Sequence, residues 1–286
     1  MNSILIILVV ITISAQHVAK KNYSERTGGT AAITFSALSA LVAGLFFVFQ
    51  IKLPISIDTA IIPYAIIFGL GYGSAVLCSV LAIACGSLSL TSLITSYSLI
   101  IPTLYGMFFL NEEISSFLIV GLFLLMISLF LINFVKGNAT GEKISLKWLF
   151  YVMVAFFGNG ICSAAQKVQQ VDFEGKYKAE FMVIALIIVV TALVILAFFT
   201  EKKDVVPAIK KGIVPIVICG AANGVANLLV MILSTRTSAS VMYPLVSAGS
   251  IILTYFISKF WYKEKLTKLQ NIGFALGVAS VIFLNL

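Results

Sequence analysis

Apolar residues in this chain gather in long runs that short polar or charged segments separate. Each run spans 16 to 25 residues, and as a helix rising about 1.5 Å per residue it is long enough to cross about 30 Å of hydrocarbon. The ten runs are residues 3–18, 30–50, 60–84, 88–110, 114–135, 148–168, 181–200, 213–234, 239–260 and 269–286. The alternating pattern of barrel strands is absent from the sequence, so the runs predict transmembrane helices and an all-α polytopic protein.

Composition agrees with a bilayer as the solvent. Of the 286 residues, 60% are hydrophobic and 10% are charged, with a mean hydropathy of +1.11. Water-soluble domains carry about 25% charged residues, so a soluble globule is excluded. Three of the four cysteines lie inside apolar runs and Cys85 directly follows one, all without metal or redox spacing, which is typical of small buried side chains. We therefore expect no metal and no cofactor.

The net charge of +8 arises from cations in the segments between runs. They do not gather on one helix face, so we expect no nucleic-acid partner. Counted over alternate segments, fourteen lysines and arginines fall on one side and four on the other. By the positive-inside rule the lysine-rich side is cytoplasmic, and ten spans then put both termini outside a cytoplasmic membrane.

The two halves of the sequence resemble each other. Matching positions keep a nearly constant offset of 150 to 152 residues, which is typical of an internal repeat. The matches are Ser14-Ala15-Gln16-His17-Val18 with Ala164-Ala165-Gln166-Lys167-Val168, Gly69-x-x-x-Gly73 with Gly220-x-x-x-Gly224, and Glu112, Gly121 and Asn133 with Glu264, Gly273 and Asn285. Because each half holds five spans, the second must enter the membrane upside down. We expect repeats at 1–136 and 148–286, joined by a cytoplasmic linker at 137–147.

Each half also repeats a helix end, a glutamate and a glycine nine residues later: Phe108-Phe109-Leu110-Asn111-Glu112 leading to Gly121, and Phe260-Trp261-Tyr262-Lys263-Glu264 leading to Gly273. This pattern resembles the EamA repeat of the drug/metabolite transporter superfamily. The resemblance implies ten helices in an inverted five-plus-five arrangement, around a central cavity lined by helices 1, 3, 4, 6, 8 and 9. The sequence departs from the family at one point. The fourth-helix proline is present as Pro102, but Thr254 stands at its counterpart in the ninth helix, and Pro244 lies earlier.

Polar side chains inside the runs are costly in hydrocarbon, so those present usually face a cavity or one another. The cavity candidates are Gln16, His17, Tyr72, Ser96, Tyr97, Asn159, Gln166, Lys167, Asn223, Asn227, Tyr243 and Ser247. Alternatives stay open for four of them. His17 either titrates in the cavity or lies at the interface; Lys167 either faces the cavity or snorkels to the surface. Asn223 and Asn227, one turn apart, either line the cavity or bond helices together.

These features favour a secondary transporter over an enzyme. The sequence has no Walker A motif and no set of side chains that would form a catalytic centre. No carboxylate lies within an apolar run, so nothing resembles the first-helix glutamate with which the related small multidrug resistance proteins bind cationic drugs and protons. The resemblance therefore disfavours cation–proton antiport by that route and favours a neutral, zwitterionic or anionic solute. We expect a small metabolite to be exported by alternating access by a monomer or homodimer in the bilayer. The alternative is a lipid-linked-sugar flippase component or a lipid-binding membrane subunit.

Overall fold

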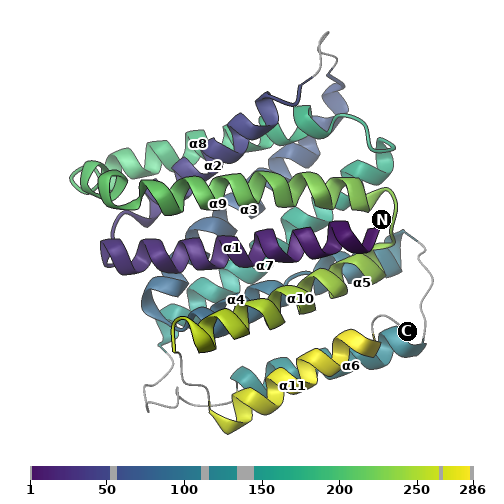
Figure 1. Ribbon diagram of the computed structural model, residues 1–286. Helices are drawn as coiled ribbons and strands as arrows, with labels where there is room; N and C mark the ends of the chain where they lie inside the picture. The colour runs from purple at the N-terminus through teal and green to yellow at the C-terminus, as the bar shows by residue number, and fades with distance from the viewer. Residues whose placement is uncertain (1, 52–56, 111–115, 134–144, 264–266, 284–286) are drawn as a thin grey trace.

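The computed structural model describes residues 2–51, 57–110, 116–133, 145–263 and 267–283, and these residues form a bundle of helices without a strand (Figure 1). A short 3-10 turn, Thr59–Ile61, precedes the third helix. The helices are α1 (Asn2–Thr27), α2 (Ala32–Val48), α3 (Ile62–Cys85), α4 (Leu88–Tyr97), α5 (Ile100–Phe109), α6 (Ser116–Asn133), α7 (Leu146–Asp172), α8 (Lys178–Thr200), α9 (Val205–Ser234), α10 (Ala239–Phe260) and α11 (Lys268–Phe283).

Each of the ten apolar runs contains a helix. The run at 88–110 contains two, α4 and α5, and every other run contains one. Among the described residues, seven helical stretches are long and apolar enough to cross a membrane, and the shorter apolar helices lie at Ala32–Val48, Ile119–Ser128 and Asn271–Ser280. Large apolar side chains such as Leu70, Phe123 and Phe199 remain exposed on the outer surface. An apolar exterior of this extent is typical of a surface that faces lipid.

Two helices extend well past the expected runs. The helix α1 continues to Thr27, so that Lys20 and Lys21 belong to the helix and not to a loop. The helix α9 begins at Val205, eight residues before the expected 213. Most of the expected linker and the motif residues Glu112 and Glu264 lie outside the described residues.

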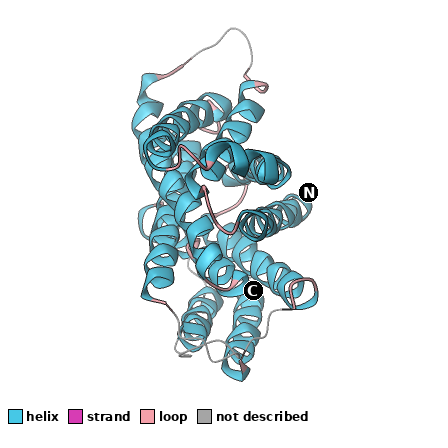
Figure 2. Ribbon diagram, turned by 90° about the vertical axis from the view of Figure 1, so that its left-hand side faces the viewer, coloured by secondary structure: helices cyan, strands magenta, loops and turns pink. Residues whose placement is uncertain are grey.

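In the bundle, helices of the first half of the sequence pack against helices of the second half. The most extensive contacts are α3 with α7, α1 with α9, α2 with α8 and α6 with α11. Figure 2 shows α6 and α11 as a separate pair at one edge. They are tied to the rest partly through Tyr97 of α4, whose hydroxyl is hydrogen-bonded to Ser128 of α6 at 2.7 Å.

The contact of α3 with α7 is a backbone-to-backbone crossing. A Cβ atom added at Gly158 would lie 2.6 Å from the carbonyl oxygen of Gly71 and 2.7 Å from the Ser74 hydroxyl. A Cβ at Gly71 would lie 2.8 Å from the carbonyl oxygen of Gly158. Small residues at such crossings allow helices in membranes to gain close packing, which replaces the hydrophobic effect as the source of association.

The break between α4 and α5 has a local cause in Pro102. A proline has no N–H to donate, so the carbonyl of Ser98, four residues earlier, loses its helical partner. The Ile101 amide donates to that carbonyl at 3.0 Å in a tighter turn. From α7, the Asn159 side chain donates to the Ser98 hydroxyl at 2.6 Å. In α10, Thr254 stands at the corresponding position and the helix is unbroken from Ala239 to Phe260, although it contains Pro244.

We predict that Gly158→Ala destabilises the protein. The added methyl group has no room at the crossing, and overpacking of this kind costs about 1–3 kcal/mol. Gly73→Ala is the control, because a Cβ at Gly73 would lie 3.6 Å from its nearest neighbour, a Val189 methyl group. Thermal unfolding of the two purified variants should rank Gly158→Ala clearly below Gly73→Ala. Equal melting temperatures would contradict the crossing.

Candidate functional site

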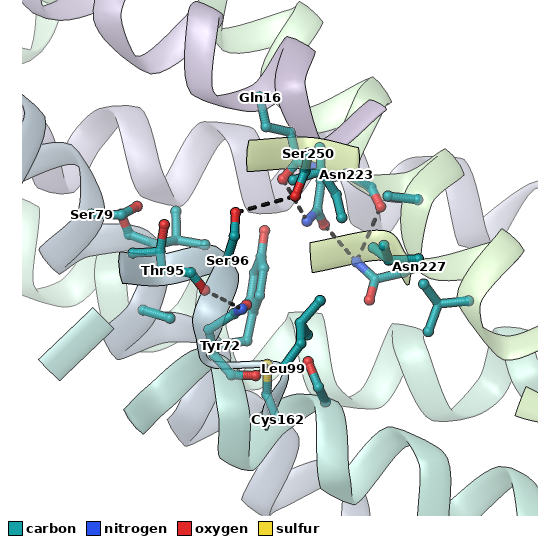
Figure 3. Close-up of a pocket in the computed structure, with 18 of the residues that line it drawn as sticks. Gln16, Tyr72, Ser79, Thr95, Ser96, Leu99, Cys162, Asn223, Asn227 and Ser250 are labelled. Carbon is teal, nitrogen blue, oxygen red and sulfur yellow. Dashed lines mark hydrogen bonds between the residues drawn. The ribbon is translucent and has the colours of Figure 1, made fainter. Parts of the chain in front are cut away.

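A polar cavity of about 120 Å³ lies where α1, α3, α4, α7, α9 and α10 meet (Figure 3). When α4 and α5 are counted as one helix, these are helices 1, 3, 4, 6, 8 and 9, which the family resemblance implies. Nine of the twelve predicted side chains line it: Gln16, His17, Tyr72, Ser96, Asn159, Gln166, Asn223, Asn227 and Tyr243. One water molecule occupies about 30 Å³ in the liquid, so this volume suits a few waters or a small solute. Pockets for drug-sized ligands are larger, at about 300–1,000 Å³.

One wall of the cavity is a chain of side-chain amides. Gln166 of α7 donates to the Asn227 oxygen, Asn227 donates to the Asn223 oxygen, and Asn223 donates to the Gln16 oxygen of α1, each at 3.1 Å. The chain therefore joins α7, α9 and α1. For Asn223 and Asn227, both open alternatives hold, since these residues line the cavity and also hydrogen-bond neighbouring helices.

The facing wall is formed around the break between α4 and α5. Asn159 donates to the Ser98 hydroxyl, Tyr243 of α10 donates to the Ser163 carbonyl at 3.0 Å, and Ser250 donates to the Ser96 hydroxyl at 3.2 Å. The Tyr72 hydroxyl makes no hydrogen bond within the described part of the chain. Irregular backbone inside a membrane is tolerated where it lines a cavity, and such breaks often mark binding sites in transporters.

A cation that the sequence analysis missed lies at one end of the cavity. Lys20 lines it and is 7% exposed, and its ammonium group donates to the Ser79 hydroxyl of α3 at 2.7 Å. Hydropathy alone places Lys20 in a loop, because the apolar run ends at residue 18. The helical spacing from Ile13 through Gln16 to Lys20 was the available signal, because it places all three on one face of a longer helix.

Three predicted residues do not line the cavity. Tyr97 is fully buried and its hydroxyl bonds Ser128 on the far side of α4. Ser247 donates to the Ser96 carbonyl at 2.7 Å, between α10 and α4. Lys167 donates to the carbonyl oxygens of Ser234 at 2.8 Å and Thr237 at 3.1 Å.

The position of Lys167 follows from helix geometry. It directly follows the cavity residue Gln166, and successive helical residues point about 100° apart at 3.6 residues per turn. Its side chain reaches the end of α9, where the last carbonyls have no intrahelical partner and a cation is favourable. Neither open alternative for Lys167 describes this arrangement, because the residue is 4% exposed and its ammonium group caps a neighbouring helix.

Within the described residues, no group of three His, Cys, Asp or Glu side chains is placed to hold a metal ion. The cavity instead offers amides, hydroxyls, an imidazole and one ammonium group. This set can hold a small polar molecule through hydrogen bonds and charge.

We predict that Lys167→Met lowers the free energy of unfolding by about 2 kcal/mol. Two hydrogen bonds from a charged group are lost, at about 1.5–3 kcal/mol each, and removal of a buried charge offsets part of this loss. Lys176→Met is the control, since that side chain is 66% exposed. Thermal or denaturant unfolding of both variants measures the difference. A Lys167→Met variant as stable as the control would show that the cap contributes nothing.

Comparison with known proteins agrees with this architecture. Residues 146–286 match the model of the EamA-like transporter family. No curated protein matches the chain. Of 28 matching chains of solved structures, one titled "Crystal structure of protein" aligns over 100% of this chain and 98% of that chain, with a TM-score of 0.74 and 13% identity, a likeness that shows the fold alone. Through the matched residues and its apolar helices, the chain belongs to the EamA-like transporter family and is a multi-pass membrane protein.

Proposed function

We propose that this protein is a secondary transporter that exports a small metabolite across the cytoplasmic membrane by alternating access. The observation that carries the proposal is the polar cavity, which is lined by helices from both halves of a membrane-embedded bundle. A binding site near the bilayer midplane between two repeats is the usual arrangement in secondary transporters.

An inverted repeat is part of the proposal, and the helix contacts support it. Exchanging α1 with α7, α2 with α8, α3 with α9, α4–α5 with α10 and α6 with α11 leaves the main contacts unchanged. Contact α3–α7 becomes α9–α1, α2–α9 becomes α8–α3, and α1–α10 becomes α7 with α4–α5; the pairs α2–α8 and α6–α11 map onto themselves. A two-fold axis in the membrane plane produces this exchange pattern.

The glycine pairs support the same relation at the level of single atoms. A Cβ at Gly69 would meet the carbonyl oxygen of Ala185 and the side chain of Ile188. A Cβ at Gly220, the repeat partner of Gly69, would meet the carbonyl oxygen of Ser39 and the side chain of Val42. In both halves the carbonyl and the side chain are three residues apart on the second helix of the other half, so the two glycines make similar close contacts.

Orientation and direction complete the proposal. The end of the bundle that carries Lys20, Lys21, Lys202 and Lys203 is assigned to the cytoplasm by the positive-inside rule. Export is inferred from the family resemblance. Rocking of one repeat against the other would open the cavity to each side in turn.

A lipid-handling function is the second candidate, and an apolar groove favours it. The groove lies on the outer side of the α3–α7 crossing, is lined by residues such as Leu70, Phe150 and Phe157, and has a volume of about 580 Å³. The backbone contact of Gly71 with Gly158 lies between this groove and the polar cavity. A flippase needs a polar path for the headgroup beside the apolar path for the chain, so the separation favours a small solute over a lipid.

We predict that the protein, reconstituted into liposomes, transports small polar metabolites with saturable flux and counterflow. Asn227→Leu should lower the flux at least tenfold, because it removes the middle amide of the Gln166–Asn227–Asn223 chain, and hydrogen bonds of this kind contribute about 0.5–1.5 kcal/mol each, with a further penalty for partners left unsatisfied. The control is Asn271→Leu on the exposed face of α11.

The outcome that would contradict the proposal is folded protein without saturable flux for any amino acid, nucleoside or organic acid tested. Movement of a fluorescent lipid between leaflets under the same conditions would favour the second candidate. Equal loss of flux in both asparagine variants would mean that the amide chain has no special role.

A further inference from the structure

Among the described residues, Lys20 differs from the buried Lys167 in having an incomplete set of partners. An ammonium group has three donor hydrogens, and the hydrogen bond to the Ser79 hydroxyl at 2.7 Å uses one of them. Lys167 by contrast donates to two main-chain carbonyls at the end of α9. Lys20 therefore has donor capacity left, and it lies on the cavity wall.

No counter-charge balances Lys20 within the described residues. No carboxylate there lies within 4.0 Å of its ammonium nitrogen. The other groups that face it are the imidazole of His17 on α1, the Ser79 hydroxyl on α3 and the thiol of Cys219 on α9. A buried ammonium group without an anionic partner is costly.

His17 supplies the second observation. It lies one turn before Lys20 on the same helix, lines the same cavity and is 6% exposed. Its Nδ1 atom is buried and has no hydrogen-bond partner among the described residues. Buried polar atoms without a partner are rare in folded proteins, and some of those that occur bind an ion or take part in a protein's function. The His17 imidazole, which lines the cavity, is thus a second group on this wall that can bind a ligand.

The remaining lining limits the size and the polarity of what binds. The volume of about 120 Å³ suits a small solute and is below the range of pockets for drug-sized ligands. The amides of Gln16 and Asn223 lie within the same lining and provide hydrogen-bonding groups next to the cation. A small molecule with one anionic group and one or two hydroxyl, keto or amino groups matches this set.

We propose that Lys20 and His17 bind the carboxylate of a small organic acid or amino acid in this cavity. The carboxylate accepts from the two free donors of Lys20 and from the His17 imidazole, while the polar substituent reaches the amides of α1 and α9. The assignment rests on the proposed transport function for its physiological meaning, but binding itself can be measured without transport.

The test measures thermal unfolding of the full-length protein in nanodiscs, with and without a set of small carboxylates (acetate, pyruvate, lactate and alanine), the neutral isostere lactamide, and inorganic phosphate. At least one carboxylate should raise the melting temperature, and lactamide should not. Lys20→Met should weaken that response at least tenfold in concentration, Lys20→Arg should retain most of it, and His17→Leu should weaken it by a smaller factor. Lys21→Met is the control, because Lys21 is the adjacent residue on α1 and does not line the cavity.

The unliganded variants separate binding from a structural role. If Lys20 serves the anion, Lys20→Met without ligand should be at least as stable as the unchanged protein, since the substitution removes an unpaired buried charge. A marked loss of stability, combined with an unchanged ligand response, would show that Lys20 is a structural tether and overturn the proposal. So would a response to phosphate alone, or no response to any carboxylate.

Failure of this inference is distinguishable from failure of the proposed function. Lys20-dependent carboxylate binding without flux in liposomes would retain the binding site and reject transport. Saturable flux of neutral solutes that Lys20→Met leaves unchanged would retain transport and reject the anion site.

Discussion

The structure depends on one constraint: polar groups inside a bilayer must find their partners within the protein. Backbone amides meet it by forming helices, which is why the apolar runs and the helices coincide. Where the helix is interrupted before Pro102, the Ile101 amide donates to the Ser98 carbonyl, and the Asn159 side chain of a neighbouring helix donates to the Thr95 carbonyl and the Ser98 hydroxyl. For the same reason, the side-chain amides from Gln166 to Gln16 hydrogen-bond one another. Cavity lining and helix packing are therefore performed by the same side chains.

Much of the fold could be predicted from the sequence, because a run of about 20 apolar residues has few alternatives in a membrane. The ends of the helices were harder to predict. The helix α1 continues through Lys20 and Lys21 to Thr27, and hydropathy alone ends the span where charges begin. A lysine that is buried by neighbouring helices looks the same in sequence as a lysine in a loop. Only tertiary contacts, here with Ser79 of α3, separate the two cases.

The candidate site shows a related limit. Polarity within a run predicted that a side chain avoids lipid, and nine of the twelve candidates line the cavity. For Tyr97, Lys167 and Ser247, the partner is another helix instead. One sequence does not determine the rotation of a helix that is apolar on all sides, since no polar stripe marks the inner face. Residues adjacent to true lining positions are the ones most easily misassigned.

The two halves of the sequence are similar, but the charged side chains that they bring to the cavity are not. By the sequence offset, His17 corresponds to Lys167 and Lys20 corresponds to Gln170. Lys167 donates hydrogen bonds to the end of α9, and Gln170 is fully buried beside Gln169. Within the described bundle, a lysine therefore reaches the cavity from the first half and not from the second. Two similar halves can supply similar helices for the rocking motion proposed here, but an anionic group would be held nearer the end of the cavity where Lys20 lies. The amides of Gln16 and Gln166, which are repeat partners, would then offer the same hydrogen-bonding groups to the rest of the solute from either side.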